Sequence, residues 1–412
     1  MAPERIDLAV IGGGPAGLAA AIAARAAGVE RVVVLEREAE AGGIPRHCGH
    51  PPFGWAEFRR ILTGPTYARR IAARASASGV DIRCNHTVVQ LGPAGELACR
   101  NAEGAVTLAA KRVVLATGAR ETPRSALLAT GDRPLGVLNT GALQSLVYLE
   151  GLVPFRRPVI VGTELVSYSA ILTARRAGIR PVAMIDAGPG PIARWPCAVF
   201  PRLLGIPVHY GAEVADIRGR PRVEAVDVRC GDGSRHTLAC DGVLFTGGFV
   251  PAAELVRQSP LALDPLAGGP VVDQYGRCTD PAYFAAGNLL RPVETAGWSY
   301  REGTAVGRLA ALDLQGRLPA PDAECTLEIA AGDGLKYALP QRIVLPWRGA
   351  DGLPGLQLRV RRAITGLLTI LAGNRQLYQR RVSVRPERRL IVPLDGLDLP
   401  DRAGRLQVGF QG

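Results

Sequence analysis

The chain has 412 residues, of which 47% are hydrophobic and 21% are charged. This length exceeds one ordinary hydrophobic core, so two or three domains are expected, and the apolar content excludes an intrinsically disordered chain. No uncharged apolar stretch approaches the ~20 residues of a membrane span, and the start MAPERIDLAV lacks the basic and apolar regions of a secretory signal. We therefore expect a cytoplasmic protein without a transmembrane segment.

The eight cysteines and the charge distribution narrow the chemistry further. No CxxC pair or close cluster occurs, which argues against a zinc ribbon, an iron-sulfur cluster or a sequence-adjacent redox disulfide. From residue 331 onward, thirteen arginines and one lysine oppose six acids, so this last fifth carries +8 of the total net charge of +12. Such a segment is typical of a surface that meets an acidic protein, nucleic acid or a membrane, although a solvated basic face is the simpler alternative.

A dinucleotide-binding unit is predicted at the start of the chain. A strand over 7–11 enters a turn with GxGxxG spacing, a helix follows, and a second strand over 31–35 ends in Glu36. Glycines allow the tight turn and close approach to a pyrophosphate, whose charge is met by amide groups and the helix dipole, while the acid can hold the adenosine ribose. The glycines of the motif are Gly12, Gly14 and Gly17.

The next segments are shorter. The apolar spacing over 57–78 predicts helical structure interrupted at Gly64 and Pro65, and short strands follow to residue 108. KRVVLATGAR, over 111–120, predicts an apolar strand that breaks at its ATG.

The segment 157–186 repeats the first unit, since Gly162 and Asp186 are 24 residues apart, as are Gly12 and Glu36. Its second glycine position is Glu164. A carboxylate ~4 Å from a phosphate costs roughly 4 kcal/mol at an effective dielectric near 20, almost a thousandfold in affinity. We expect Glu164 to replace the phosphate by meeting the free amides and dipole of the helix. Asp186, expected on an exposed strand end, argues the other way because it would suit an NAD ribose; a vestigial nicotinamide site is favoured, and a working one stays open.

The remaining elements complete the second unit and then change in character. A strand at 208–209, a hairpin over roughly 222–241 and the strand of DGVLFTGGFVP precede a helix over 300–316. After the linker PAPDAE, short runs rich in β-branched residues, separated by turn residues, predict a small all-β domain, with a sandwich as the candidate arrangement.

These motifs resemble the pyridine nucleotide-disulfide oxidoreductase superfamily of two-dinucleotide-domain flavoproteins. GGGPAG with Glu36, the ATG at 116–118, the TGG at 246–248 and the AAGN at 285–288 occur in the family's order. The resemblance implies an α/β fold of two Rossmann-like, glutathione-reductase-like domains, with the second inserted in the first. The domains expected are an FAD domain over 1–122 and 242–318, a degenerate NAD(P)-binding-like domain over 123–241, and a basic β-rich domain over 319–412.

The resemblance also implies which residues hold FAD. Asn288 stands where the family places an aspartate on the ribityl chain, and the amino end of the last helix, preceded by Glu294, Thr295 and Trp298, is expected to face the flavin pyrimidine; capping and packing are the alternative for these three. The full set of cofactor-binding residues implied is Gly12, Gly14, Pro15, Ala16, Gly17, Glu36, Arg37, Gly43, Ile44, Arg46, His47, Val88, Ala116, Thr117, Gly118, Gly287, Asn288 and Thr295.

His47, Cys48 and His50 are the candidates for a catalytic role, because the resemblance places their segment beside the isoalloxazine ring. No metal is expected there, since a fourth ligand is not visible. A redox role for Cys48 would need a lowered pKa or a partner cysteine.

Within the superfamily, AGGIPRHCGHPPFG and VETAGWSYREGTAVG are most similar to FAD subunits of multi-subunit amino-acid, opine and glycerol-3-phosphate dehydrogenases. That similarity implies FAD-dependent electron transfer from a small-molecule substrate. The partner implied is a second flavin or iron-sulfur subunit, and no nucleic acid is expected. Peripheral attachment of the complex to the inner membrane face is a further option.

Two other functions stay open at this point. The alternatives are a self-sufficient NAD(P)H-dependent flavin reductase and a non-catalytic FAD-binding assembly subunit. The chain departs from the family in lacking paired redox cysteines, a dimerisation domain and a cysteine-rich tail.

Overall fold

A computed structural model describes residues 3–193, 197–346, 352–353, 355–386 and 388–411. Two compact units form: Met1–Gly43 with Ala68–Ala119 and Pro251–Gly412, and Ile44–Tyr67 with Arg120–Val250. Among the residues described, no helix combines the length and apolar character needed to cross a bilayer.

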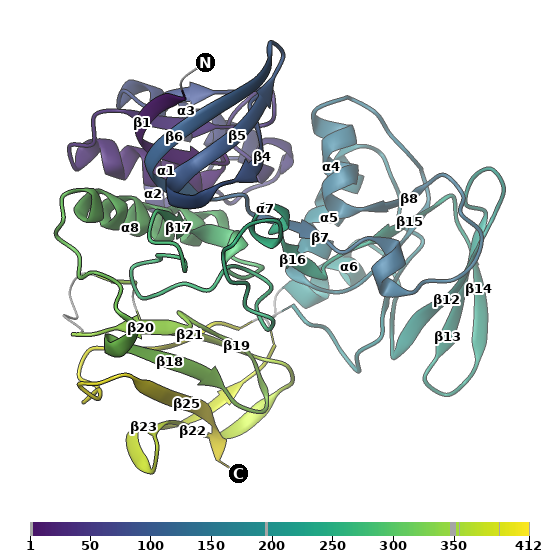
Figure 1. The fold of residues 1–412 in the computed structure, drawn as a ribbon. Helices are drawn as coiled ribbons and strands as arrows, with labels where there is room; N and C mark the ends of the chain where they lie inside the picture. Colours follow the sequence, from purple (N-terminus) through teal and green to yellow (C-terminus); the bar gives the residue numbers. More distant parts are fainter. Residues whose placement is uncertain (1–2, 194–196, 347–351, 354, 387, 412) are drawn as a thin grey trace. The chain divides into compact units, whose positions relative to one another are not determined.

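The first unit is built on a sheet of order β3-β2-β1-β6-β5-β4, to which β17 adds by pairing in parallel with β6 (Figure 1). The run LAVI at the end of β1 and all of β2 are almost wholly buried, as expected for parallel strands covered on both faces. Five of the strands are parallel to one another: β1, β2, β3, β6 and β17. The pairs β4–β5 and β5–β6 are antiparallel. The strands are β1 (Glu4–Ile11), β2 (Val32–Leu35), β3 (Asp81–Arg83), β4 (Thr87–Leu91), β5 (Glu96–Asn101), β6 (Gly104–Leu115) and β17 (Tyr283–Ala285).

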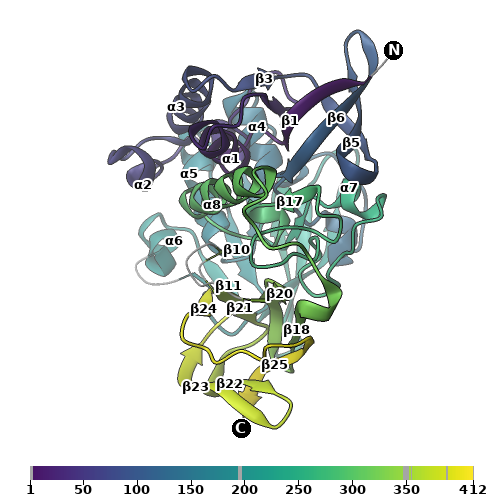
Figure 2. The same cartoon turned by 60° about the vertical axis from the view of Figure 1, so that its left-hand side comes forward.

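Two helices of this unit pack closely side by side, α1 (Pro15–Ala26) and α8 (Ala296–Leu314) (Figures 1 and 2). A Cβ at Gly303 would lie 2.0 Å from the Ala16 carbonyl oxygen, and one at Gly307 would lie 2.1 Å from that of Ala20, so only glycine permits this approach. α8 begins four residues before the predicted start at 300. The reason is the N-cap, because the Thr295 hydroxyl accepts a hydrogen bond from the Trp298 amide at 3.4 Å.

The second unit holds a parallel sheet of order β11-β10-β9-β15-β8 and an antiparallel sheet of order β12-β13-β14. β15 pairs with β9 and β8, so residues 242–245 belong to this sheet, and the second unit continues to Val250. The sequence predicted that the FAD domain resumes at residue 242. It also predicted residues 44–67 in the FAD domain, whereas they lie in the second unit. Its elements are β8 (Val137–Asn139), α4 (Thr140–Tyr148), β9 (Pro158–Val161), α5 (Leu165–Arg176), β10 (Ala183–Asp186), α6 (Phe200–Leu203), β11 (Val208–Tyr210), β12 (Ala212–Arg218), β13 (Ala225–Cys230), β14 (Arg235–Ala239) and β15 (Gly242–Phe245).

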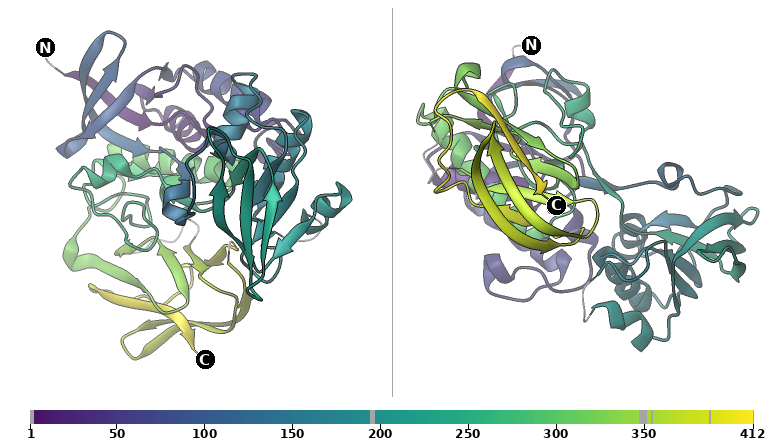
Figure 3. Two further views of the ribbon diagram at one scale, coloured as in Figure 1. Left: turned by 90° about the vertical axis from the view of Figure 1, so that its right-hand side faces the viewer. Right: turned by 90° about the horizontal axis from the view of Figure 1, so that it is seen from below.

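The last part of the chain forms two sheets that share one hydrophobic core, with strand orders β20-β18-β25-β22-β23 and β19-β21-β24 (Figure 3, green to yellow). The two sheets agree with the predicted all-β structure and its candidate sandwich arrangement. These strands belong to the first compact unit. The strands are β18 (Thr326–Ala331), β19 (Leu335–Leu339), β20 (Arg342–Val344), β21 (Leu356–Val360), β22 (Ile364–Ala372), β23 (Arg375–Val384), β24 (Leu390–Val392) and β25 (Gly404–Gln411).

The connecting elements are short. In place of one interrupted helix over 57–78, the chain forms α2 (Trp55–Phe58) and α3 (Gly64–Ala77). The others are β7 (Ala119–Glu121), β16 (Phe249–Pro251) and α7 (Glu254–Arg257).

Candidate functional site

Of the three glycines in the turn between β1 and α1, only Gly14 has free space where a side chain would lie. A Cβ at Gly12 would lie 2.5 Å from the Ala116 carbonyl oxygen, and one at Gly17 would lie 1.9 Å from the Gly12 carbonyl oxygen. A Cβ at Gly14 would instead meet nothing nearer than the Gly43 Cα at 3.9 Å. The free amides and positive dipole end of α1 therefore face a space that suits a phosphate group.

Glu36 is held in place at the carboxyl end of β2, beside this turn. Its Oε2 accepts a hydrogen bond from the Gly13 amide at 2.8 Å, and its Oε1 accepts one from the Glu38 amide at 2.9 Å. Each carboxylate oxygen can accept a further bond. The donor set, the open turn and the fixed carboxylate fit the diphosphate and ribose of a dinucleotide such as FAD.

Gly287 follows β17 and brings a second segment beside the β1–α1 turn and Glu36. We call this group of residues the first cradle, and the corresponding turn of the second unit with Asp186 the second cradle. A Cβ there would lie 2.7 Å from the Ala16 Cβ, and Gly287 has φ +76°, a left-handed value. Asn288 uses its amide to close the loop that follows: Oδ1 accepts from the Glu294 amide at 2.7 Å, and Nδ2 donates to the Glu294 carbonyl at 3.2 Å. Its predicted contact with the ribityl chain would use its remaining bonding capacity and stays a prediction.

Other predicted FAD residues in this unit have clear local roles. The Thr117 hydroxyl donates to the Ala252 carbonyl at 2.8 Å, just after β6. Val88 packs its side chain into the hydrophobic core, so only its backbone is available to a cofactor. Arg37 follows Glu36 and is exposed. Gly43 lies against the β1–α1 turn, because a Cβ at this position would be only 2.8 Å from the Gly14 Cα.

The segment that carries Ile44, Arg46, His47, Cys48 and His50 belongs to the second unit. There a chain of hydrogen bonds ties it to α4 and α5. Cys48 Sγ donates to the Gln144 side chain at 3.5 Å, Gln144 donates to Ser169 Oγ at 2.7 Å, and His50 Nε2 lies 2.5 Å from Ser169 Oγ. Within the described ranges, no three His, Cys, Asp or Glu side chains are grouped to hold a metal. The placement of this segment beside the flavin stays a prediction.

Cys48 is expected to be chemically inert. Burial, with a smaller contribution from the Glu121 carboxylate, raises the pKa of its thiol to about 12, and only the thiolate attacks electrophiles. In native protein treated with iodoacetamide at mildly alkaline pH, peptide mass spectrometry should find the part-exposed Cys230 alkylated well before Cys48. Cys48→Ser should leave flavin reduction unchanged. Preferential labelling of Cys48 would contradict this prediction.

The second turn, between β9 and α5, is filled. A Cβ at Gly162 would lie 2.4 Å from Glu164 Oε2, and one at Gly247 would lie 2.5 Å from Glu164 Oε1, so the carboxylate occupies the space between the two glycines. Its Oε2 accepts hydrogen bonds from Ser167 Oγ at 3.4 Å and from Thr246 Oγ1 at 3.3 Å. The pKa of Glu164 is raised above the usual value of a glutamate, mainly because its carboxylate is buried.

Two expectations about this turn were wrong. Glu164 is the N-cap residue of α5 but makes no side-chain capping bond; its carboxylate accepts hydrogen bonds from the two hydroxyl groups and from its own backbone amide instead. Asp186 is not exposed: it is 6% accessible, and it accepts hydrogen bonds from Thr163 Oγ1 at 2.5 Å and the Gly188 amide at 2.8 Å.

Sequence reasoning missed Ser167, which takes the third glycine position of the second turn. The spacing could have revealed it, since Gly12 and Gly17 are five residues apart, as are Gly162 and Ser167. It also missed the contact made by Thr246, the first residue of the TGG at 246–248. The Thr246 hydroxyl lies 2.7 Å from that of Ser167, and residue spacing does not encode a contact across 79 positions. Two of the three glycines of the first turn are thus replaced by side chains that contact each other.

Comparison with known proteins agrees with this geometry. Residues 6–303 match the family model described as Pyridine nucleotide-disulphide oxidoreductase. A subunit of the opine oxidase of Agrobacterium tumefaciens (strain Ach5) is 28% identical over 357 residues, which are 79% of this chain and 66% of that protein. The alpha subunit of the sarcosine oxidase of Corynebacterium sp. (strain P-1) is 30% identical over 326 residues, which are 74% of this chain and 32% of that protein.

Two solved structures share the fold. Thioredoxin reductase of T. acidophilum superposes with a TM-score of 0.61 at 22% identity, over 76% of this chain and 98% of that chain. L-proline dehydrogenase from P. horikoshii superposes with a TM-score of 0.57 at 21% identity, over 77% of this chain and 57% of that chain. The predicted fold class, two Rossmann-like domains with C-terminal strands, is confirmed.

The chain spans 66% of the opine oxidase relative and 32% of the sarcosine oxidase relative, so those proteins contain further sequence. The family match itself covers well over half of the chain and includes both phosphate turns. The chain therefore belongs to the pyridine nucleotide-disulphide oxidoreductase family.

Proposed function

We propose that this chain is an FAD-dependent oxidoreductase subunit that transfers electrons within a multi-subunit dehydrogenase of a small organic substrate. FAD, when bound, supplies the two-electron redox chemistry. The residues that would hold it are those of the open turn at Gly14, with Glu36 on its adenosine side and Gly287 on the other side. The family match and the oxidase subunits among its relatives support this proposal.

The observation that carries the proposal is the contrast between the two turns. Above Gly14 the space is free, whereas the equivalent position of the second turn carries Glu164, whose carboxylate lies between Gly162 and Gly247. A nicotinamide dinucleotide needs that space for its diphosphate. Electrons must then reach or leave the flavin through a substrate and a partner protein.

The partner proposed is a second dehydrogenase subunit that carries a flavin or an iron-sulfur centre. By their names, the opine oxidase and sarcosine oxidase relatives are themselves parts of larger assemblies. Opines and sarcosine are N-substituted amino acids, so a secondary amine is the substrate class to test first. Such an assembly would work in the cytoplasm or against the inner membrane face.

The test is an anaerobic titration of the purified yellow protein, followed by its visible flavin absorbance. Micromolar NADH is expected to leave the absorbance unchanged, and a secondary amine is expected to bleach it only after the co-purified partner is added. Bleaching by micromolar NADH alone would contradict the proposal and favour the reductase. A flavin that dithionite cannot cycle would favour the non-catalytic assembly role.

The reductase alternative has one structural observation in its favour. Asp186 is oriented by Thr163 and Gly188 much as Glu36 is oriented by Gly13 and Glu38. An acid in this position suits a nucleotide ribose. The same NADH titration therefore decides between the two functions.

A further inference from the structure

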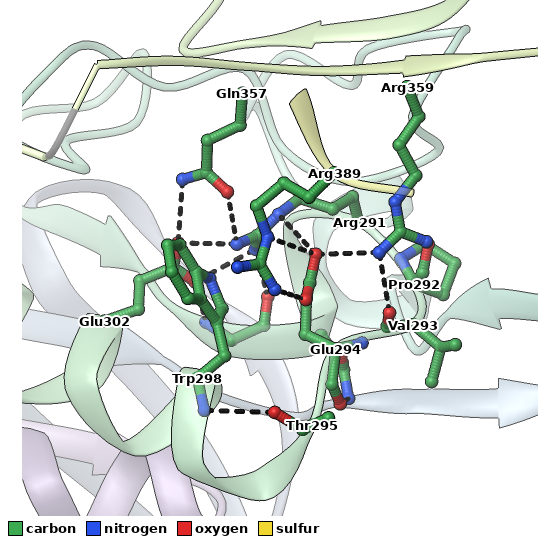
Figure 4. Close-up of polar contacts among 12 residues, drawn as sticks. Arg291, Pro292, Val293, Glu294, Thr295, Trp298, Glu302, Gln357, Arg359 and Arg389 are labelled. Atoms are coloured by element: carbon green, nitrogen blue, oxygen red, sulfur yellow. Dashed lines mark hydrogen bonds and ion pairs between the residues drawn. The ribbon is translucent and has the colours of Figure 1, made fainter. Parts of the chain in front are cut away.

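A buried charge cluster joins the C-terminal strands to the segment that begins α8. Two of its arginines come from the C-terminal strands: Arg359 lies on β21, and Arg389 immediately precedes β24. The others come from the segment after β17 and from α8 (Figure 4). We call this group the α8 charge cluster; it comprises Arg291, Glu294, Glu302, Arg359 and Arg389.

Glu294 is the centre of the α8 charge cluster. Arg359 donates to Glu294 Oε1 at 2.8 Å and to the Val293 carbonyl at 2.9 Å. Arg389 donates from Nε to Glu294 Oε1 at 3.1 Å and from a terminal nitrogen to Oε2. Its guanidinium carbon also lies 3.4 Å from the ring centroid of Trp298, in the first turn of α8. The C-terminal strands therefore hold the residues on both sides of the Thr295 cap.

The second pair of the cluster lies deeper. Arg291 donates to both oxygens of Glu302, at 2.9 and 2.8 Å, and to the Gln357 side chain of β21 at 2.8 Å. The cluster holds three arginines and two glutamates, so its net charge is 3 − 2 = +1. All five side chains are buried except that of Arg389, which is 22% exposed, so solvent screens this surplus only weakly.

The surplus charge lies at the end of the cradle opposite Glu36. β1 pairs with β2 on one side and with β6 on the other, and β17 lies beyond β6. A dinucleotide with its diphosphate at the end of β1 and its adenosine at Glu36 must therefore extend its other half toward Gly287 and α8.

The register of α1 and α8 places the start of α8 beside that half. Gly303 lies against Ala16 and Gly307 against Ala20, so the helices run in the same direction. Thr295, eight residues before Gly303, then projects about 12 Å beyond the level of Ala16, at 1.5 Å per residue.

Ser299, one turn into α8, points to a ligand independently. It is 6% exposed, its hydroxyl has no hydrogen-bond partner among the residues described, and the hydroxyl lies 3.8 Å from the position of a Cβ at Gly287. Buried hydroxyls are nearly always hydrogen-bonded. A cofactor in this part of the cradle would supply the missing partner.

We propose that Arg359 and Arg389 are positioning residues, which fix the first turn of α8 against the flavin half of FAD and, with Arg291, favour the reduced flavin by their surplus positive charge. This inference rests on the proposed function, since it assumes FAD in the first cradle. Oxidised FAD takes up two electrons and one proton to give the reduced flavin anion, which carries one more negative charge. A fixed positive charge and the positive end of a nineteen-residue helix both stabilise that added charge.

The test uses variants whose charge changes have opposite sign. Arg389→Gln lowers the charge of the cluster to zero and should lower the equilibrium constant for flavin reduction about tenfold, which is about 30 mV for a two-electron couple. Glu294→Gln raises the charge to +2 and should raise the potential by a similar amount, and the double variant should return close to the wild type. The potential is measured by anaerobic dithionite reduction, in which dithionite supplies the electrons, against a reference dye.

Controls separate charge from packing. Arg389→Lys keeps the charge and should keep the potential, whereas Arg380→Gln removes an exposed arginine of β23 and should change nothing. If Glu294→Gln does not fold, the comparison of Arg389→Gln with Arg389→Lys still decides. FAD-loaded variants with equal potentials, or shifts of the same sign in both single variants, would overturn the inference. A wild-type protein that binds no FAD would instead overturn the proposed function.

Discussion

Gly14→Glu is expected to give a folded protein that no longer retains FAD. This variant copies Glu164 of the second turn into the first. The backbone accommodates it, because Gly14 has φ −79° and ψ −176°, close to the −71° and 170° that Glu164 adopts. A carboxylate ~4 Å from a phosphate charge costs roughly 4 kcal/mol at an effective dielectric near 20, which is almost a thousandfold in affinity.

The measurement is the dissociation constant of FAD for the apoprotein, with a thermal melt to verify folding. Gly14→Gln is the matched control, because it adds nearly the same volume without charge and should weaken binding less. Gly17→Ala should behave differently from both: its Cβ would lie 1.9 Å from the Gly12 carbonyl oxygen, so it should lower the melting temperature of the protein itself. Unchanged FAD affinity in Gly14→Glu would show that the cofactor lies elsewhere.

The reciprocal change should open the second turn. Glu164→Gly removes the carboxylate between Gly162 and Gly247, and adding Ser167→Gly restores the glycine spacing of the first turn. We expect NADH affinity to rise in the double variant by two to three orders of magnitude, from the same electrostatic argument of roughly 4 kcal/mol. Asp186, already oriented, would then be available to the ribose.

Calorimetric titration with NADH measures this effect, and Glu164→Gln separates charge from volume. The pH dependence gives an internal check. Because burial raises the pKa of Glu164, the carboxylate takes up a proton at a higher pH than a free glutamate does, so lowering the pH should improve NADH binding to the wild type and not to the glycine variant. Equal NADH affinity in the wild type and the double variant would refute our account of this turn.

The strands, turns and helices of both cradles could be predicted because each depends on local spacing. Gly12 and Glu36 lie within one strand-turn-helix-strand unit, so the sequence places them together without tertiary information. Glu164 was visible for the same reason. The third glycine position at Ser167 carried an equally local signal.

Contacts between distant segments could not be predicted. Asp186 was expected to be exposed, yet it is buried at the end of β10, where the Thr163 hydroxyl and the Gly188 amide donate hydrogen bonds to its carboxylate. Residues 44–67 were expected in the FAD domain, yet Cys48 and His50 bond to side chains of α4 and α5 about a hundred residues later. No periodicity encodes a pairing at that separation.

The basic C-terminal segment shows most clearly the difference between what local sequence predicts and what contacts between distant segments decide. Its composition predicted a charged surface, and most of its arginines are indeed exposed, but Arg359 is buried and bonds to Glu294, sixty-five residues earlier. The sequence by itself determined the two dinucleotide-binding units, their unequal turns and the change to β structure, because these follow from residue order over ~30 positions or fewer. Only the tertiary structure decided which charges are buried together at the start of α8, because an arginine becomes a partner or a solvated side chain according to what the packing of distant strands brings within hydrogen-bond reach.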